Sequence, residues 1–253
     1  MALSLVALLL ATGRSAFAQE SETEPKEHPL TAAIRIAQDS YERAKALDDY
    51  RATFTKSEVV RGRTYPSKMT MKFRAEPFSV YLLFVNPENA GREVLYVEGQ
   101  NNGMMLAHDT GLRALAGTVP VDPHGQMALA EARHPITQIG LANMVEGVIK
   151  QWKKESKFGE SEVKYYPEAT LGGRDVLVIE SSHPRPRNQF PFAITRLWID
   201  EETKLAVRLQ NYIFPREAGG EPILVEDYTY TDIQPNVGLT DRDFDPRNPA
   251  YDF

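Results

Sequence analysis

Five histidines and a C-terminal group of aspartates are the side chains best suited to metal or acid–base chemistry. The histidines are His28, His108, His124, His134 and His183. None is paired at the spacing of a helical zinc site, and the sequence has no HExxH motif, CxxC motif or aspartate-rich calcium loop. His108-Asp109 and Asp122-x-His124 fall in predicted loops and could share a metal ion, but turn and cap chemistry is the commoner use of such residues. We therefore predict no metal site and no cofactor.

The C-terminal aspartates suggest a calcium site or a capped turn. They are Asp241, Asp243, Asp245 and Asp252, beside Arg242 and Arg247. The spacing lacks the glycine and the distal glutamate of a known calcium loop, so we predict a capped turn after the last strand. The sequence also lacks a GxSxG elbow, a P-loop and a dinucleotide-binding fingerprint. A triad of distant residues is left open, and the prediction is a protein that is not an enzyme.

Charge and the first residues indicate partners and location. A net charge of −6 and a pI of about 5.5 provide no basic face for nucleic acid. Leu3–Ala11 is apolar but too short to span a bilayer, and Ala16-Phe17-Ala18 fits a cleavage site, although no Lys or Arg precedes the apolar run. Without a later long apolar run or any cysteine, we expect no integral membrane segment, no disulfide and no acylated anchor. We predict a signal peptide at 1–18, a disordered leader at 19–29 and one domain at 30–253, in a periplasmic or otherwise exported protein.

A predicted antiparallel meander, Lys68–Ala107, organises the rest of the chain. Met69, Met71 and Phe73 alternate with polar residues, which is typical of a half-buried strand. The next run, Phe78–Val85, is apolar on both faces. Because an antiparallel sheet needs only one apolar face, we expect a cover on each side. A helix is expected on one side, and a second sheet, a partner or a ligand cavity on the other.

Two amphipathic helical regions are predicted to pack on this sheet. The first is Leu30–Leu47, and the second is Gln126–Lys157, which Pro135 divides and in which His134 is expected to cap a helix. The apolar stripe of the second region consists of Leu141, Met144, Val145, Val148, Ile149 and Trp152. Further strands are predicted at Tyr50–Val60, Glu162–Tyr166, Asp175–Glu180, Ile194–Asp200, Ala206–Phe214 and Leu224–Ile233. The order fits an α+β fold with one curved antiparallel sheet and helices on its concave side.

Several motifs resemble the DUF1571 family of exported bacterial proteins. They are Glu226–Asp232 (EDYTYTD), Asn236–Asp245 (NVGLTDRDFD), Asn248–Phe253 (NPAYDF) and His134–Gly140 (HPITQIG). A wider resemblance is to the LolA/LolB-like lipoprotein-carrier fold, carried by Phe54-Thr55-Lys56, Arg74–Phe78 and Phe244-Asp245-Pro246. That resemblance implies an incomplete β-barrel with a helical lid over an apolar cavity. It does not by itself imply a lipoprotein cargo, because one fold hosts many functions.

The leading hypothesis is a soluble exported carrier or sensor of a hydrophobic ligand, such as a lipid or a lipoprotein acyl chain. Residues 140–153 are expected to act as the lid. The expected ligand-binding residues are Met69, Met71, Phe73, Tyr81, Phe84, Met104, Leu141 and Val145. The alternative is a non-catalytic structural or interaction module of the cell envelope, in which the loop His183–Pro191 meets a protein partner through Arg185 and Arg187. An envelope hydrolase is a third reading.

Overall fold

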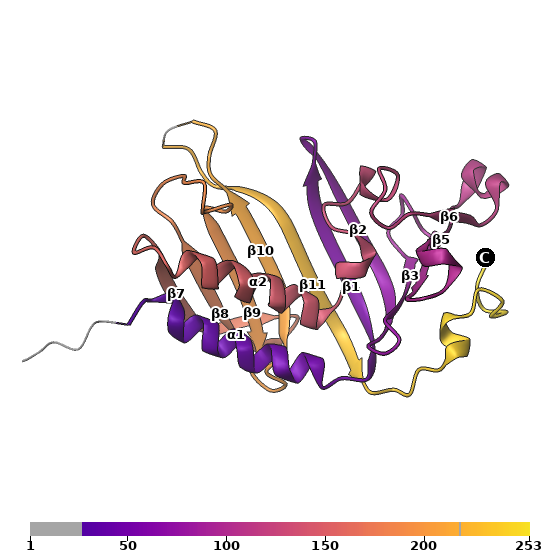
Figure 1. The fold of residues 1–253 in the computed structure, drawn as a ribbon, viewed down its shortest axis with the longest axis horizontal. Helices are drawn as coiled ribbons and strands as arrows, with labels where there is room; N and C mark the ends of the chain where they lie inside the picture. The colour runs from indigo at the N-terminus through magenta and orange to yellow at the C-terminus, as the bar shows by residue number, and fades with distance from the viewer. Residues whose placement is uncertain (1–26, 218) are drawn as a thin grey trace, which may run out of the picture.

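The fold is built on one antiparallel sheet (Figure 1). The computed structural model describes residues 27–217 and 219–253, so the predicted signal peptide at 1–18 and leader residues 19–26 lie outside the described residues. In the described part, eleven strands lie in the order β6-β5-β4-β3-β2-β1-β11-β10-β9-β8-β7. The strands are β1 Asp49–Val60, β2 Arg63–Arg74, β3 Ser79–Phe84, β4 Glu93–Val97, β5 Met105–His108, β6 Val119–Val121, β7 Glu162–Leu171, β8 Arg174–Ser182, β9 Ile194–Asp200, β10 Ala206–Ile213 and β11 Ile223–Pro235.

Two meanders make up this sheet. Strands β1 to β6 follow one another as neighbours, as do β7 to β11, and the pairing of β1 with β11 joins the two halves. Strands β6 and β7 lie at opposite edges and do not pair, so the curved sheet stays open. The structure thus confirms the predicted incomplete barrel. No helix in the described residues has the length and apolar character needed to cross a membrane.

Helices α1 (Leu30–Lys45) and α2 (Leu141–Glu155) lie side by side across the β7–β11 half, on the concave face of the sheet (Figure 1). Leu141, Val145 and Trp152 of α2 are at most 1% exposed. They pack in one core with α1 and with inward-facing residues of both halves of the sheet. The apolar stripe predicted from helical spacing is therefore the buried face of α2, as hydrophobic burial requires.

The second apolar face of the meander is covered by the chain's own C-terminal segment, residues 236–253. Val80 and Leu82 of β3 point into the helix-side core, whereas Tyr81 points to the other face. There Tyr81 stacks on Tyr251 with ring centroids 4.1 Å apart, and Phe244 is buried beside it. In Figure 1 this yellow segment leaves the end of β11 and runs past the start of β1 toward β3. The expected helical cover is present on one face, but the second face is covered by a segment of the same chain and not by a second sheet, a partner or a cavity.

The predicted helical region Gln126–Lys157 is helical only in its second half. Before α2 the chain forms two short 3₁₀ turns, Ala128–Ala130 and Ile136–Gln138. Gly140 precedes α2 with φ +117°, a conformation that ends any continuous helix there. His134 caps no helix, and the prediction of a cap was wrong, because its ring is engaged by a carboxylate of β11.

Candidate functional site

A cavity of about 550 Å³ lies between the sheet and its cover. The cover consists of α2 and the covering loop, which we define as residues 128–139. The apolar part of the sheet wall is Phe54, Met69, Leu82, Phe84, Val94, Met105 and Leu209. The apolar part of the cover is Ala128, Ala132, Pro135, Ile136, Ile139, Met144, Val148 and Trp152. The walls are thus largely aliphatic and aromatic, as in pockets that hold small apolar ligands.

Helix α2 is fastened at both ends. At its start the backbone N–H groups of Gly140 and Leu141 donate to the hydroxyls of Tyr230 and Tyr50, each at 3.1 Å. At its end Glu155 Oε2 lies 3.3 Å from Nε2 of His183, and both side chains are almost completely buried. Burial raises the pKa of both tyrosines, so their hydroxyls stay neutral. Lid motion of α2 remains a prediction, and any such motion has to break these contacts.

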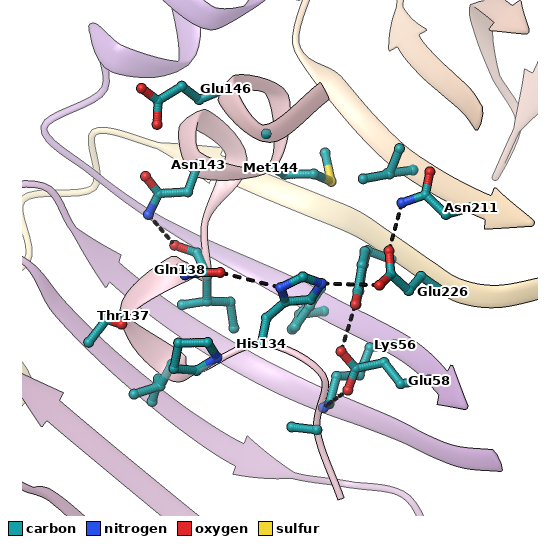
Figure 2. Close-up of a pocket in the computed structure, with 18 of the residues that line it drawn as sticks. Lys56, Glu58, His134, Thr137, Gln138, Asn143, Met144, Glu146, Asn211 and Glu226 are labelled. Carbon is teal, nitrogen blue, oxygen red and sulfur yellow. Dashed lines mark hydrogen bonds and ion pairs between the residues drawn. The ribbon is translucent and has the colours of Figure 1, made fainter. Parts of the chain in front are cut away.

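A cluster of charged and polar side chains forms one part of the cavity wall (Figure 2), and Arg133 joins it from just outside the lining through its bond to Glu226. We call it the polar cluster: Lys56, Glu58, Arg133, His134, Asn211, Glu226 and Tyr228. Glu226 Oε1 accepts from Arg133 Nε at 2.6 Å and lies 3.1 Å from His134 Nε2. Its other oxygen accepts from Asn211 Nδ2 at 2.6 Å. Glu58 accepts from Lys56 Nζ and from the Tyr228 hydroxyl, both at 2.6 Å. Both carboxylates are therefore held by two or more donors.

The two carboxylates are buried, and Glu226 remains ionised. Glu58 is 1% and Glu226 is 3% exposed. Burial acts to raise the pKa of Glu226, but its bonds with His134, Asn211 and Arg133 outweigh burial and lower that pKa to about 2. The hydrogen bond with Glu226 in turn raises the pKa of His134, which favours its cationic form. Burial, together with the two carboxylates, raises the pKa of Tyr228. The cluster is therefore a compact array of fixed charges.

The structure separates the eight expected ligand-binding residues. Met69 and Phe84 line the cavity. Met71, Phe73, Leu141 and Val145 are buried in the core behind it and do not line it. Tyr81 lies on the opposite face under Tyr251, and the neighbour of Met104 in the chain, Met105, lines the cavity instead. The role of all eight in binding a ligand stays a prediction.

The polar cluster was not predicted, although its signal is present in the sequence. In β1 the inward face begins with Tyr50, Ala52 and Phe54 and continues with Lys56 and Glu58. Charged residues at core-facing positions of a strand are costly unless they are paired. Such a break in an otherwise apolar face marks a site. The partners on β10, β11 and the covering loop come together only through the fold.

The other chemical candidates are engaged in turns and ion pairs. Asp109 binds Arg92 through two hydrogen bonds, and Asp122 accepts from the backbone N–H of His124 at 2.9 Å. In the part of the chain that the structure describes, no group of three or more His, Asp or Glu residues could hold a metal ion. Near the C-terminus, Asp243 completes a capping box with Thr240, which confirms the predicted capped turn.

Comparisons with known proteins give one family match and several likenesses of structure. A family model described as "Protein of unknown function (DUF1571)" matches residues 47–253, a range that contains the whole polar cluster. A search of curated proteins finds no match. The chain is similar to Mycobacterium tuberculosis lipoprotein LppX, with 12% identity, 83% of this chain and 97% of that chain covered, and a TM-score of 0.48. It is also similar to a DUF1329 family protein from Desulfovibrio piger, with 15% identity, 86% of this chain and 97% of that chain covered, and a TM-score of 0.39. A third similar structure is the LolA superfamily protein NE2245 from Nitrosomonas europaea, with 11% identity, 83% of this chain and 97% of that chain covered, and a TM-score of 0.34.

Proposed function

Since the chain belongs to the DUF1571 family, whose description assigns no function, we propose a function from the cavity: the protein binds a lipid or another acyl-chain ligand and is a non-catalytic carrier or sensor. The main support is a cavity of about 550 Å³ that the chain's own side chains leave unfilled. One water needs only about 10–15 Å³ of such space. Pockets of roughly 300–1,000 Å³ are the usual size for small-molecule ligands. The apolar walls suit a hydrocarbon chain.

The energy of burying an acyl chain is sufficient for this role. About fifteen methylenes at ~0.8 kcal/mol each contribute about 12 kcal/mol before costs. Association costs at least about 4 kcal/mol in lost translational and rotational freedom. The remainder is at most about 8 kcal/mol, which corresponds to a dissociation constant of about 1 μM at the tightest. Binding of useful strength therefore needs no catalytic group.

The proposed location is outside the cytoplasmic membrane, and it rests on the signal peptide predicted for residues 1–18. In this setting the cover over the cavity, α2 with the covering loop, separates the ligand from water. The partner that loads or receives the ligand is proposed to be another envelope component. A pure interaction module has less support, because Arg185 and Arg187 of its suspected contact loop already pair with Glu160, at 3.6 and 2.9 Å.

Native mass spectrometry of the mature protein, purified from its own envelope and followed by organic extraction, tests the proposal. We expect a stoichiometric adduct whose extracted mass identifies an acyl-containing molecule. A parallel sample of protein refolded from urea and incubated with membrane lipids should regain the adduct. A bare mass in both samples contradicts the carrier proposal and directs attention to protein partners.

A further inference from the structure

We propose that the polar cluster is the head-group site of the cavity and that it selects an acidic amphiphile, one whose single acyl chain ends in a carboxylate or a phosphate. The proposal rests on the proposed function, because it assigns the chemistry of the ligand that the cavity holds. His134 lines the cavity, and Arg133, just outside the lining, is bonded to the same oxygen atom of Glu226; we expect these two residues to contact the acidic group.

The acids of the cavity are already satisfied. Glu58 is held by Lys56 and Tyr228, and Glu226 by Arg133, His134 and Asn211. The third acid on the wall, Glu146, pairs with Lys150 one helical turn away at 2.8 Å. A ligand with a cationic head therefore finds no unpaired carboxylate in the described cavity wall. Displacing a resident cation from a buried carboxylate is costly, because it leaves that carboxylate without its partner.

The cations exceed the acids within the polar cluster. Arg133 and His134 share one oxygen atom of Glu226, whereas Lys56 has Glu58 as its own partner. With His134 protonated, the cluster holds three positive and two negative groups. The groups that face His134 are Glu226 and Tyr228 on β11, Glu58 and Lys56 on β1, and its neighbour Arg133. Its hydrogen bond to Glu226 raises the pKa of His134, which supports the cationic form. An acidic head group would restore charge balance at a partly desolvated site.

The surplus charge is accessible, whereas the carboxylates are not. The side chains of Arg133 and His134 are 34% and 48% exposed, against 3% for Glu226. Arg133 uses Nε for Glu226 and Nη1 for the carbonyl oxygen of Val59, and within the described contacts its Nη2 has no partner. A guanidinium that is held by one edge can still donate to carboxylate or phosphate oxygens. The second ring nitrogen of His134, Nδ1, lies 3.3 Å from the amide oxygen of Gln138 (Figure 2), a neutral partner that an acidic head group would replace, while the carboxylate acceptors stay buried.

Four ligands with the same twelve-carbon chain test the proposal: dodecanoate, dodecyl phosphate, dodecanol and dodecylammonium. Their affinities for the whole mature protein are measured by calorimetry at pH 6, below the critical micelle concentrations. We expect the two acids to bind about ten- to a hundredfold more tightly than dodecanol, the range for a hydrogen bond between charged groups. The ratio between the two acids shows which acidic group is preferred. Dodecylammonium should bind no better than dodecanol.

Three variants assign the selectivity to residues. Arg133→Gln and His134→Gln should each lower the preference for acid over alcohol several-fold while dodecanol still binds, which shows that the cavity remains formed. Lys154→Gln is the matched control, because it also removes one positive charge, from the exposed face of α2, but belongs neither to the cavity lining nor to the polar cluster. It should leave the preference unchanged.

The outcomes separate this proposal from the proposed function. Equal affinity of the wild-type protein for acids and alcohol, or a preference for the amine, overturns the head-group site but leaves a carrier. An acid preference that Lys154→Gln reduces as much as Arg133→Gln overturns the assignment to the polar cluster. Failure of all four ligands to bind overturns the proposed function itself.

Discussion

Gly147, in the middle of α2, offers a direct test of whether the cavity is the ligand site. It lines the cavity at its exposed mouth, near Asn143 and Gln151 on adjacent turns of the same helix. Apart from its chain neighbours and the backbone of α2, a Cβ atom placed on it meets no atom within 4 Å, so a side chain there has room. Glycine in a helix interior costs about 1 kcal/mol relative to alanine, which makes its presence here unfavourable for the helix alone. We predict that Gly147→Phe obstructs the cavity and that Gly147→Ala does not.

The magnitudes follow from helix propensity and packing. Gly147→Ala should raise the stability by up to about 1 kcal/mol, or roughly 2–4 °C in Tm. Gly147→Phe should be at least as stable as the wild type without ligand, because phenylalanine is also a better helix former than glycine. With ligand, an added ring in a filled space costs about 1–3 kcal/mol. That cost weakens affinity by roughly 5- to 150-fold.

The assay is titration calorimetry of both variants with dodecanoate, with thermal unfolding of the ligand-free proteins alongside. Both variants are expected to fold, so weaker binding by Gly147→Phe alone cannot be attributed to a damaged core. If Gly147→Phe is stable and binds dodecanoate like the wild type, the cavity beneath α2 is not the ligand site. Equal losses in both variants would also refute the reasoning, since alanine adds almost no bulk.

Three further predictions concern stability. Because the pKa of Glu226 is lowered to about 2 from 4.5, its ionised form stabilises the folded protein by about 3 kcal/mol above pH 4.5, and this contribution is lost as the pH falls from 4.5 toward 2. Urea midpoints measured from pH 6 to pH 3 should therefore fall less steeply in Glu226→Gln than in the wild type, and an unchanged slope counts against this role. Gly140→Ala should lower the free energy of unfolding, measured in urea, by about 1–3 kcal/mol, because φ is +117° and the added Cβ lies 2.8 Å from the Phe73 ring. If the variant is as stable as the wild type, a side chain does not strain the backbone at this position. Tyr251→Ala should lower the free energy of unfolding by about 1–3 kcal/mol, because it removes the stacking on Tyr81 and the hydrogen bond from Lys72. The affinity for dodecanoate should not change, and weaker binding would mean that the two faces of the sheet are coupled.

Local periodicity was sufficient to predict most elements. Alternation in Tyr50–Val60 and helical spacing in Leu30–Leu47 both correspond to real elements, β1 and α1. Residues 126–140 misled the prediction, because their composition is compatible with a helix. Their actual path depends on contacts far away in the chain. Pro135 and the positive φ of Gly140 break the helix, and ion pairs to β11 hold the resulting loop.

The candidate site was predictable only in part. The apolar character of Met69 and Phe84 is a property of the sequence, and both line the cavity. Which apolar residues line the cavity and which fill the core is decided by packing. Met71 shares its alternating pattern with Met69, yet it does not line the cavity. Spacing cannot separate such residues, because both lie on the same inward face of β2.

By itself, the sequence determined that this chain forms an antiparallel sheet with an amphipathic helix and that one stretch of the sheet is apolar on both faces. Those properties follow from side-chain periods of two and 3.6, which are local. Tertiary structure decided that the C-terminal segment covers one face, that a cavity remains under α2 on the other, and that Glu58 and Glu226 meet Arg133 and His134 there. These contacts join residues up to about two hundred positions apart. They depend on the sheet pairing β1 with β11, which no local pattern encodes.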